Sequence, residues 1–432
     1  MKSPPPTVTH APGTIRAAWS YRRFRVVFIG ASLSMIGTWM QNFTLPAYVE
    51  DRAESATLVG LMIFVQLGPL LFLSIPAGML ADRVDRTRLV IAMQSTMLVL
   101  TLVIAGLIAS DAPLWTIFLT QLGIGIANSL NAPAYAASIP MMVDRRDISG
   151  AVSLNSAMIN GTRILGPALA ALLAWQGFSI AQLLLVNAGT YLFMIVPLIF
   201  ISLPQPAGRP PERGWRQLLS GVNVARRRLV ISRSLMVMFL FSLVSLPHIG
   251  LFPSIARRNL DIAPTSTSYQ MLYVVWGTGA FLGAIAVGTS LAHIDKRVLA
   301  PAGFAGFAFA LGAFALTTNV VWAYPIALAL GFVYFMTATT LVTVLQVNLA
   351  DSERASVMPL WFMVVGGTVP IGNLIGGPLI DAIGARPVLL FGAAFALVLA
   401  RWADFRRLGP EAFLPEGEGG EPFRPVNASR QI

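Results

Sequence analysis

The sequence predicts an all-α membrane protein with twelve transmembrane helices, arranged as two pseudo-symmetric six-helix bundles. Three observations predict this fold. Apolar residues make up 56% of the 432 residues and charged residues only 11%, whereas a soluble domain carries roughly a quarter charged residues. The apolar residues gather in runs that reach the length needed to cross a bilayer as a helix, about 20 residues. A charged motif in the first half of the chain also recurs in the second half.

Twelve apolar runs are long enough to span a bilayer. In hydrocarbon, a helix satisfies its own backbone polar groups, so each run is expected to be helical. The runs cover residues 24–49, 57–80, 89–109, 113–140, 150–174, 180–203, 234–256, 268–291, 298–317, 321–346, 357–382 and 387–404. In the eighth run, Tyr269, Tyr273 and Trp276 share one helical face. We expect them to anchor that helix at a membrane interface, and the alternative is that they stack on a ligand.

Several classes of function are excluded by composition. Cysteine is absent, so there is no disulfide framework, thiolate metal site or catalytic thiol. The three histidines are scattered and no Gly-Lys-Ser nucleotide motif occurs, so neither a metal triad nor ATP hydrolysis is indicated. We therefore expect no enzyme, no cofactor and no metal. The first apolar run is also too long for a cleavable signal peptide.

The placement of cations predicts the topology. The net charge is +11, which could suggest a nucleic-acid partner. However, if the amino terminus is cytoplasmic, 25 of the 30 Lys and Arg residues fall in cytoplasmic segments. Because cytoplasmic loops of membrane proteins are enriched in cations, this asymmetry places both termini in the cytoplasm. We therefore expect the protein to be embedded in a lipid bilayer and to have no nucleic-acid partner.

The chain is expected to divide into five parts. They are a cytoplasmic tail over 1–23, a six-helix bundle over 24–203, a linker over 204–233, a second bundle over 234–405 and a tail over 406–432. The linker is Pro-rich at its start and contains Trp215 and the basic run 226–228. This pattern is typical of a cytoplasmic linker with an interfacial amphipathic helix. The glycine- and glutamate-rich tail is expected to be disordered.

Two features repeat between the halves. Asp85 follows Gly78 by seven residues and Asp295 follows Gly288 at the same spacing, each next to a cation. The second repeat lies within spans, where Gly161, Gly166 and Pro167 match a Gly-to-Gly-Pro pattern that starts at Gly372. Duplicated halves around a central cavity are a recurrent plan of secondary transporters.

These residues resemble the major facilitator superfamily over essentially the whole membrane portion. The segment Gly78-x-Leu80-Ala81-Asp82-Arg83-x-x-Arg86-x-Arg88 looks like its motif between the second and third spans. Asp85 stands where many members have glycine, and in this feature the chain resembles the bacterial branch of enterobactin exporters and macrolide efflux pumps. So do Trp39-Met40-Gln41-Asn42, Asn131-Ala132-Pro133, Arg163-Ile164-Leu165-Gly166-Pro167-Ala168 and Leu345-Gln346.

The resemblance implies a secondary transporter of the bacterial inner membrane. It would export a small amphiphilic molecule, of the siderophore or drug class, by alternating access coupled to protons. We expect a monomer. An alternative is a translocator of lysophospholipids or other lipids that enter sideways. A non-transporting sensor or scaffold is the least favoured class, because the soluble segments offer little surface for signalling.

The repeated loop motif is expected to form a conformational gate. By resemblance, Asp82 accepts hydrogen bonds from neighbouring arginines and faces the positive N-terminal end of the eleventh span, so that it locks the cytoplasmic side. The alternative is a loop that only sets topology. The gate candidates are Gly78, Asp82, Arg83, Asp85, Arg86, Arg88, Asp295 and Arg354.

Arg163 is the one formal charge near a predicted membrane midplane. Helical spacing puts it on one face with Ser156 and Asn160. Because a buried arginine in a membrane is costly, it must meet water, an acid or an anion. It therefore either attracts an anionic or strongly polar substrate or serves helix packing. The candidates for the substrate pathway are Gln41, Asn42, Gln121, Asn128, Asn131, Asn160, Arg163, Thr339, Thr343 and Gln346.

No carboxylate lies deep in the first or fourth span, where proton-coupled drug pumps that this chain resembles keep one. Either proton coupling uses a peripheral acid or a histidine, or transport is not driven by protons in the usual way. The candidates are Glu50, Asp51, His248 and Asp381. Bending or close packing of helices is expected at Gly161, Gly166, Pro167, Gly376, Gly377 and Pro378.

Overall fold

The computed structural model describes residues 11–205, 215–408 and 413. Every regular element in these ranges is helical, which confirms the predicted all-α class. Spatial contacts divide the chain into two compact units. The first is Met1–Leu45 with Val65–Gly214, and the second is Pro46–Phe64 with Trp215–Ile432. The division therefore passes through two long helices, α2 and α3, rather than between helices.

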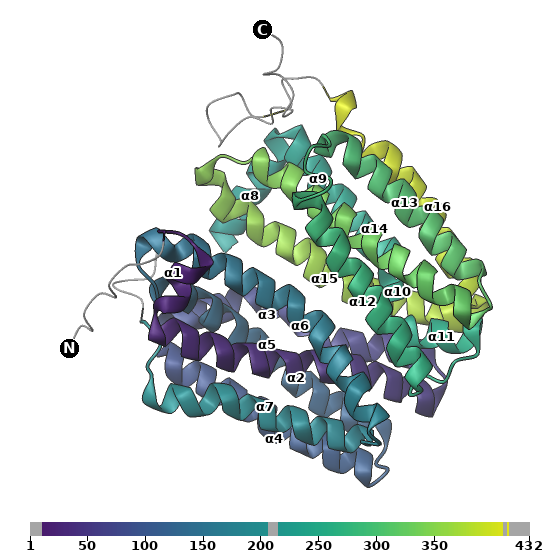
Figure 1. Cartoon of the computed structure of the whole chain (residues 1–432), viewed down its shortest axis with the longest axis horizontal. Coiled ribbons are helices and arrows are strands. Elements are labelled where there is room, and N and C mark those ends of the chain that lie inside the picture. The colour runs from purple at the N-terminus through teal and green to yellow at the C-terminus, as the bar shows by residue number, and fades with distance from the viewer. Residues whose placement is uncertain (1–10, 206–214, 409–412, 414–432) are drawn as a thin grey trace. The chain divides into compact units, whose positions relative to one another are not determined.

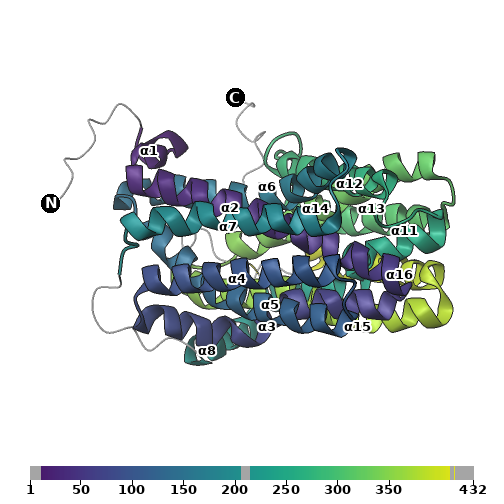
Figure 2. The same ribbon diagram turned by 90° about the horizontal axis from the view of Figure 1, so that it is seen from below.

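Apart from residues 46–64, the first unit contains the helices of the amino-terminal half (Figure 1). They are α1 Ile15–Ser20, α2 Arg22–Ala53, α3 Ala56–Arg83, α4 Arg86–Ala109, α5 Leu114–Ser138, the short η1 Ile139–Met141 and η2 Arg145–Asp147, α6 Ile148–Trp175 and α7 Ile180–Phe200. Helix α4 packs along both α5 and α7, as Figure 2 shows from below. A buried apolar cluster of this unit includes Phe24 of α2, Val90 of α4 and Tyr135 of α5.

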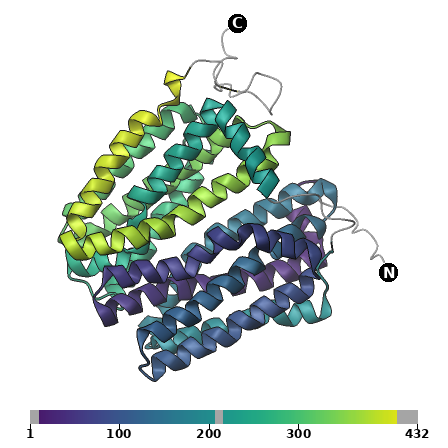
Figure 3. The ribbon, with the colours of Figure 1, turned by 180° about the vertical axis from the view of Figure 1, so that it is seen from behind.

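The second unit contains the remaining helices. They are α8 Trp215–Arg227, α9 Leu229–Leu240, the π-helical η3 Phe241–Ser245, α10 Pro247–Gly250, α11 Phe252–Leu260, α12 Thr267–Gly288, α13 Lys296–Leu316, α14 Val320–Val347, α15 Asp351–Ile383, α16 Ala385–Trp402 and η4 Phe405–Arg407. Helix α14 packs on α12 and α13, and α13 lies beside α16 in Figures 1 and 3. Helix α8 forms where the interfacial helix was expected. The tail after Arg407, for which disorder was expected, lies outside the described residues except at 408 and 413.

Local sequence signals set the helix ends. Ser179 and Gln182 form a capping box at the start of α7, which satisfies amide groups that have no partner inside the helix. Asp85 and Asp295 are the N-caps of α4 and α13 and accept from backbone amides at 2.9 and 2.8 Å. The two repeated loops thus both end in an aspartate that begins the next helix.

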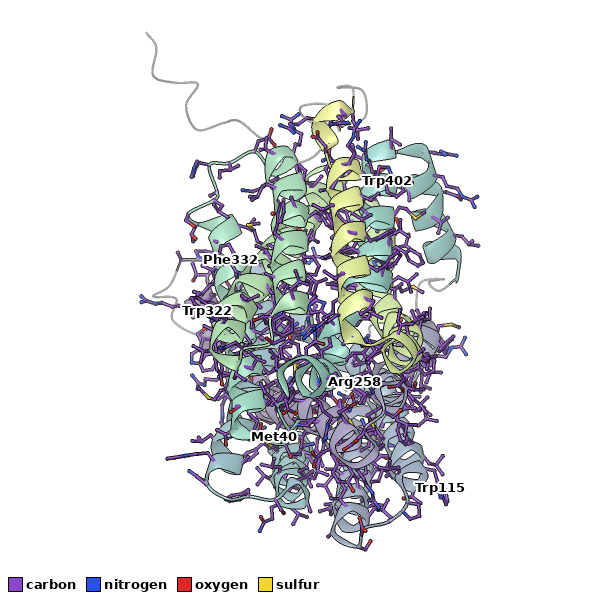
Figure 4. The ribbon with its side chains drawn as sticks, turned by 90° about the vertical axis from the view of Figure 1, so that its right-hand side faces the viewer. Met40, Trp115, Arg258, Trp322, Phe332 and Trp402 are labelled. Atoms are coloured by element: carbon purple, nitrogen blue, oxygen red, sulfur yellow. The ribbon has the colours of Figure 1, made fainter. Side chains whose placement is uncertain are left out.

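Large apolar side chains cover the outside of the helices. Figure 4 shows Trp115 and Trp322, which are 67% and 66% exposed, pointing away from the helices of their own units. Such extensive apolar surface has no counterpart on soluble proteins, so lipid must cover it. Further examples are Trp175, Phe200, Phe309, Val321, Phe362 and Phe391.

Nine helices in the described residues are long and apolar enough to cross a membrane, and α8–α9 adds a tenth candidate as a bent pair. Helices α2 and α5 are longer than 20 residues but fall below this apolarity. They contain Gln41, Asn42, Gln121 and Asn128, and polar residues of this kind are kept in spans that face protein or water rather than lipid.

The seventh predicted span is broken rather than continuous. The backbone passes from α9 through η3 to Pro247, which has no amide hydrogen to give to the helix. At this break the Nδ1 of His248 donates to the Ser245 carbonyl at 2.8 Å. The ring is buried beside Phe307, 5.5 Å between centroids.

The aromatic residues of α12 fill the core of the second unit. Tyr269 and Trp276 are only 1% and 6% exposed, and both pack against Phe252. The expectation that they anchor the helix at a membrane interface is therefore wrong for these two residues. Their helical spacing is that of a face packed against protein.

Candidate functional site

Arg163 projects from α6 without an acidic partner. Its guanidinium lies 5.0 Å from the centre of the Trp39 ring on α2, and in the described part of the chain no carboxylate is within salt-bridge distance of it. The side chain is exposed. Stacking on an indole face stabilises a cation while the edge of the guanidinium keeps its N–H donors free. The arrangement can therefore bind an anion.

The face of α6 around Arg163 is polar. At about 100° per residue, Ser156 and Asn160 fall on the same side of the helix as Arg163, and all three are exposed. Leu165 and Leu172, 53% and 49% exposed, point to the opposite side. Because lipid favours the leucine side, the polar side suits an aqueous pathway.

Four helices of the first unit meet at a buried hydrogen-bond network around Gln41. Gln41 donates to Gln121 at 2.8 Å and accepts from Thr101 at 3.1 Å and Asn187 at 2.6 Å. All four side chains are at most 1% exposed. The network joins α2, α4, α5 and α7, so Gln41 and Gln121 bond helix to helix rather than line a pathway.

Two members of this network were missed in the sequence. Asn187 lies in a span that is otherwise almost entirely apolar, and Thr101 lies in another. A buried amide in hydrocarbon must find a partner, so an asparagine in such a run is a signal that could have been used. The identity of its partner could not be read from spacing, because the four residues come from four helices.

The remaining predicted pathway residues divide between the two units. Asn42 and Asn128 are half-buried in the first unit, and the buried Oδ1 of Asn131 has no hydrogen-bond partner among the described residues. Asn160 donates to the Ser156 carbonyl of its own helix at 2.9 Å. In the second unit, Thr343 bonds to the Thr339 carbonyl and Gln346 is exposed. Each unit therefore offers its own polar groups.

The loop between α3 and α4 centres on Arg86. Arg86 is 4% exposed, pairs with Asp82 at 3.0 Å and donates to the carbonyls of Ala81 and Ala137 at 3.2 and 3.4 Å. Arg83 and Arg88 are exposed, and a side chain at Gly78 would meet nothing within 4 Å. Within its unit, Arg86 fixes the loop by its hydrogen bonds to backbone carbonyls, and the ion pair with Asp82 orients Arg86.

The second repeated loop is built in the same way. Lys296 follows the N-cap Asp295 as Arg86 follows Asp85, and its ammonium donates to the carbonyls of Leu291, Ala292 and Ile294 at 2.8–3.3 Å. Lys296 is 6% exposed. In both loops the cation after the capping aspartate is buried against backbone carbonyls, which is a shared role that the spacing alone did not show.

Two acids of α2 and one acid of the turn after it surround Arg257 in the second unit. Its guanidinium lies 2.9 Å from Asp51, 3.1 Å from Glu54 and 3.9 Å from Glu50. Glu50 is fully buried, accepts from the Ser254 hydroxyl at 2.5 Å, and leaves Oε1 without a hydrogen-bond partner among the described residues. Asp51 and Glu54 are exposed. One arginine thus lies within 4 Å of three carboxylates, and of these only Glu50 is buried.

The other two proton-coupling candidates are occupied differently. His248 lies in the first turn of α10, where its Nδ1 binds the Ser245 carbonyl and its ring packs beside Phe307. Asp381 accepts hydrogen bonds from Ser55, Ala56 and Thr57 and pairs with Arg258. These donors occupy both oxygens of the carboxylate.

The sequence matches the model of the transmembrane secretion effector family over residues 14–412. The chain belongs to this family of the major facilitator superfamily. Major facilitator proteins are transporters, not enzymes, and this chain is therefore a multi-pass membrane transporter. The predicted family resemblance is confirmed.

Curated relatives of this major facilitator protein are similar over nearly their whole length. The enterobactin exporter EntS of Shigella boydii is 24% identical over 403 residues, 90% of this chain and 94% of the relative. EntS of Escherichia coli O157:H7 is 23% identical over 409 residues, 91% of this chain and 96% of the relative.

Solved major facilitator structures show the same fold. A bacterial homologue of the human lysosomal transporter Spinster, in an inward-facing unoccupied conformation, superposes with a TM-score of 0.70 at 13% identity, over 90% of this chain and 99% of that chain. The nucleoside transporter NupG gives 0.70 at 14% identity, over 90% of this chain and all of that chain.

In each half of this major facilitator protein, an acid holds the residue that directly precedes a longer helix. Asp147, just before α6, accepts from the Gly13 amide and the Tyr21 hydroxyl at 2.8 and 2.7 Å. Glu353, in the first turn of α15, binds Arg228 at 2.6 Å. Tyr21 and Arg228 directly precede α2 and α9. Burial and the Asp147 hydrogen bond raise the pKa of Tyr21 to about 12. Arg354, the neighbouring gate candidate, is exposed.

The predicted hinge and packing residues differ in what surrounds them. A Cβ at Gly161 would meet nothing within 4 Å, whereas one at Gly166 would lie 2.6–2.8 Å from Trp39, Met40 and Ile36 atoms. Figure 4 marks Met40 on α2. Gly166 therefore lets α6 approach α2, and this approach brings Arg163 onto Trp39. Pro167 is buried and Pro378 exposed.

We expect Gly166→Ala to destabilise the protein and Gly161→Ala to leave it unchanged or slightly more stable. The added methyl at 166 overlaps α2 backbone atoms, and overpacking of this kind costs about 1–3 kcal/mol. At 161 alanine only improves helix propensity. Thermal unfolding in detergent, followed by size-exclusion chromatography, measures both. Equal stability of the two variants would contradict the close approach.

Proposed function

We propose that this protein exports a small amphiphilic molecule, of the siderophore or drug class, across the bacterial inner membrane by alternating access, and that protons drive the export. The observation that carries the proposal is Arg163, a cation within a span, stacked on Trp39 and without an acid partner among the described residues. Such a residue is costly in a membrane unless it serves a ligand or an aqueous path.

Arg163 favours substrates that combine an anionic group with an apolar body. The free edge of the guanidinium matches a planar oxyanion in a bidentate hydrogen bond, and Trp39 offers an apolar surface beside it. The corresponding residue in the repeat of α15 is Leu374, so the charge belongs to one half alone. The names of the relatives, enterobactin exporters, agree with export.

Glu50 is the best-placed group for proton coupling. It is buried, its Oε1 has no hydrogen-bond partner in the described residues, and the nearby Arg257 Nε also lacks one. A buried carboxylate without full pairing favours the protonated form, while ionised Glu50 could bind Arg257 Nε, 3.9 Å away. Arg258, Asp51, Glu54, Asp381 and Tyr269 are the other titratable groups around it.

The test is transport by purified protein in proteoliposomes under an imposed pH gradient. The panel pairs amphiphilic carboxylates with their amides and includes a labelled lysophospholipid. Preferential, gradient-dependent movement of carboxylates is the expected result. Movement of the lysophospholipid alone would replace the proposal by lipid translocation, and transport that ignores the pH gradient would remove the proton coupling.

A further inference from the structure

Asp381, in the last full turn of α15, caps the start of α3. Its two carboxylate oxygens accept from the backbone amides of Ala56 and Thr57 at 3.0 and 2.8 Å and from the hydroxyls of Ser55 and Thr57 at 3.1 and 2.5 Å. The first amides of a helix have no partner within it and carry partial positive charge. Residues more than 320 positions later in the chain thus supply the cap.

Arg258 completes the contact from α11. It pairs with Asp381 and donates to the carbonyl of Glu54 at 3.2 Å. Glu54 has a left-handed backbone, φ 49°, and ends the turn after α2. One acid therefore binds the free amides that begin α3, and one base binds a carbonyl of the preceding turn.

The backbones of α3 and α15 touch beside this cap. A Cβ on Gly60 would lie 2.3 Å from the Asn373 carbonyl oxygen, and one on Gly377 would lie 2.4 Å from the Ala56 oxygen. Position 56 faces 377 and position 60 faces 373, so the two helices are antiparallel. Close backbone packing of this kind needs small residues, and it lets the short Asp381 side chain reach the α3 amides.

We propose that Asp381 is a positioning residue of the transport cycle. Together with Arg258 it forms a clasp that holds the α2–α3 turn against α15, and this clasp separates when this end of the protein opens. The inference rests on alternating access as proposed above. Here the first two spans of the amino-terminal half dock by their turn onto helices of the carboxyl-terminal half, and all the contacts lie within one compact unit.

The experiment uses a probe that needs no substrate. The chain has no cysteine, so Leu58→Cys supplies a single thiol beside the clasp. Its reaction rate with a membrane-impermeant maleimide is compared between the otherwise natural protein and Asp381→Asn. Removing a charged cap that also binds an arginine is expected to raise the labelling rate about tenfold. Asp261→Asn, which changes an exposed acid just after α11, should leave it unchanged.

Two additions separate the possible failures. Asp381→Glu keeps the charge and should restore slow labelling if the cap is electrostatic, which a misfolded variant would not do. Gly377→Ala should speed labelling without changing any charge. Unchanged labelling in Asp381→Asn would overturn the clasp whatever the transport result. Faster labelling in a protein that moves no substrate would leave the clasp standing and remove the proposed export function.

Discussion

Arg163→Gln is expected to lower the export of amphiphilic carboxylates about ten- to a hundredfold, while the export of their amides changes little. A hydrogen bond to a charged group contributes about 1.5–3 kcal/mol, and every 1.4 kcal/mol is about tenfold. Arg163 has no acid partner in the described part of the chain, so glutamine leaves no orphaned carboxylate behind. The substitution should therefore lower the export rate of the carboxylates and leave the folding stability of the protein unchanged.

The measurement is initial export rate in proteoliposomes for each carboxylate and amide pair. Arg163→Lys keeps the charge but not the fork of donors, and should fall between wild type and glutamine. Arg386→Gln, an exposed cation of α16, is the matched control. If Arg163→Gln unfolds in detergent, or slows carboxylates and amides alike, Arg163 is a packing residue and the anion site is refuted.

Glu50→Gln is expected to abolish the dependence of export on the pH gradient while substrate exchange at equal pH continues. Glutamine imitates the protonated carboxyl and can still accept from Ser254, but it cannot give up a proton or pair with Arg257. Because the glutamine side chain neither binds nor releases a proton, the pH gradient cannot change the protonation of residue 50. Gradient-driven export should fall by about tenfold or more, the range seen when a proton-transfer group is lost.

Glu54→Gln provides the matched control for this prediction. Glu54 binds the same Arg257 at 3.1 Å but its side chain is 71% exposed, and exposed pairs contribute about 0–1 kcal/mol. Its export should stay coupled to the gradient. Persistent coupling in Glu50→Gln would exclude Glu50 and return attention to His248 or Asp51.

Much of the fold follows from the order of residues along the chain. Each of the twelve apolar runs coincides with a long helix or, at 229–260, with a broken one, because a bilayer-length apolar segment has no other way to satisfy its backbone. The repeated Asp85 and Asp295 mark helix starts because capping is local. The family could be identified from motifs that are contiguous in sequence.

The partners of polar side chains could not be predicted in this way. Gln41 and Gln121 were candidates for the pathway, yet the structure turns them toward Asn187 and Thr101, residues of two other helices. Glu50, Asp51 and Asp381 looked alike as peripheral acids, and only their surroundings distinguish a buried, half-paired carboxyl from an exposed one and from a helix cap.

By itself the sequence determined the class of protein, the helices and the family, since hydropathy, caps and motifs depend on near neighbours in the chain. Tertiary structure alone decided which charges are free and which are held. Among the described residues no acid pairs with Arg163, whereas Arg86 is buried on its own loop and pairs with Asp82, although both are arginines of one bundle. The cost of a charge depends on the atoms that surround it, and those come from helices far apart in sequence.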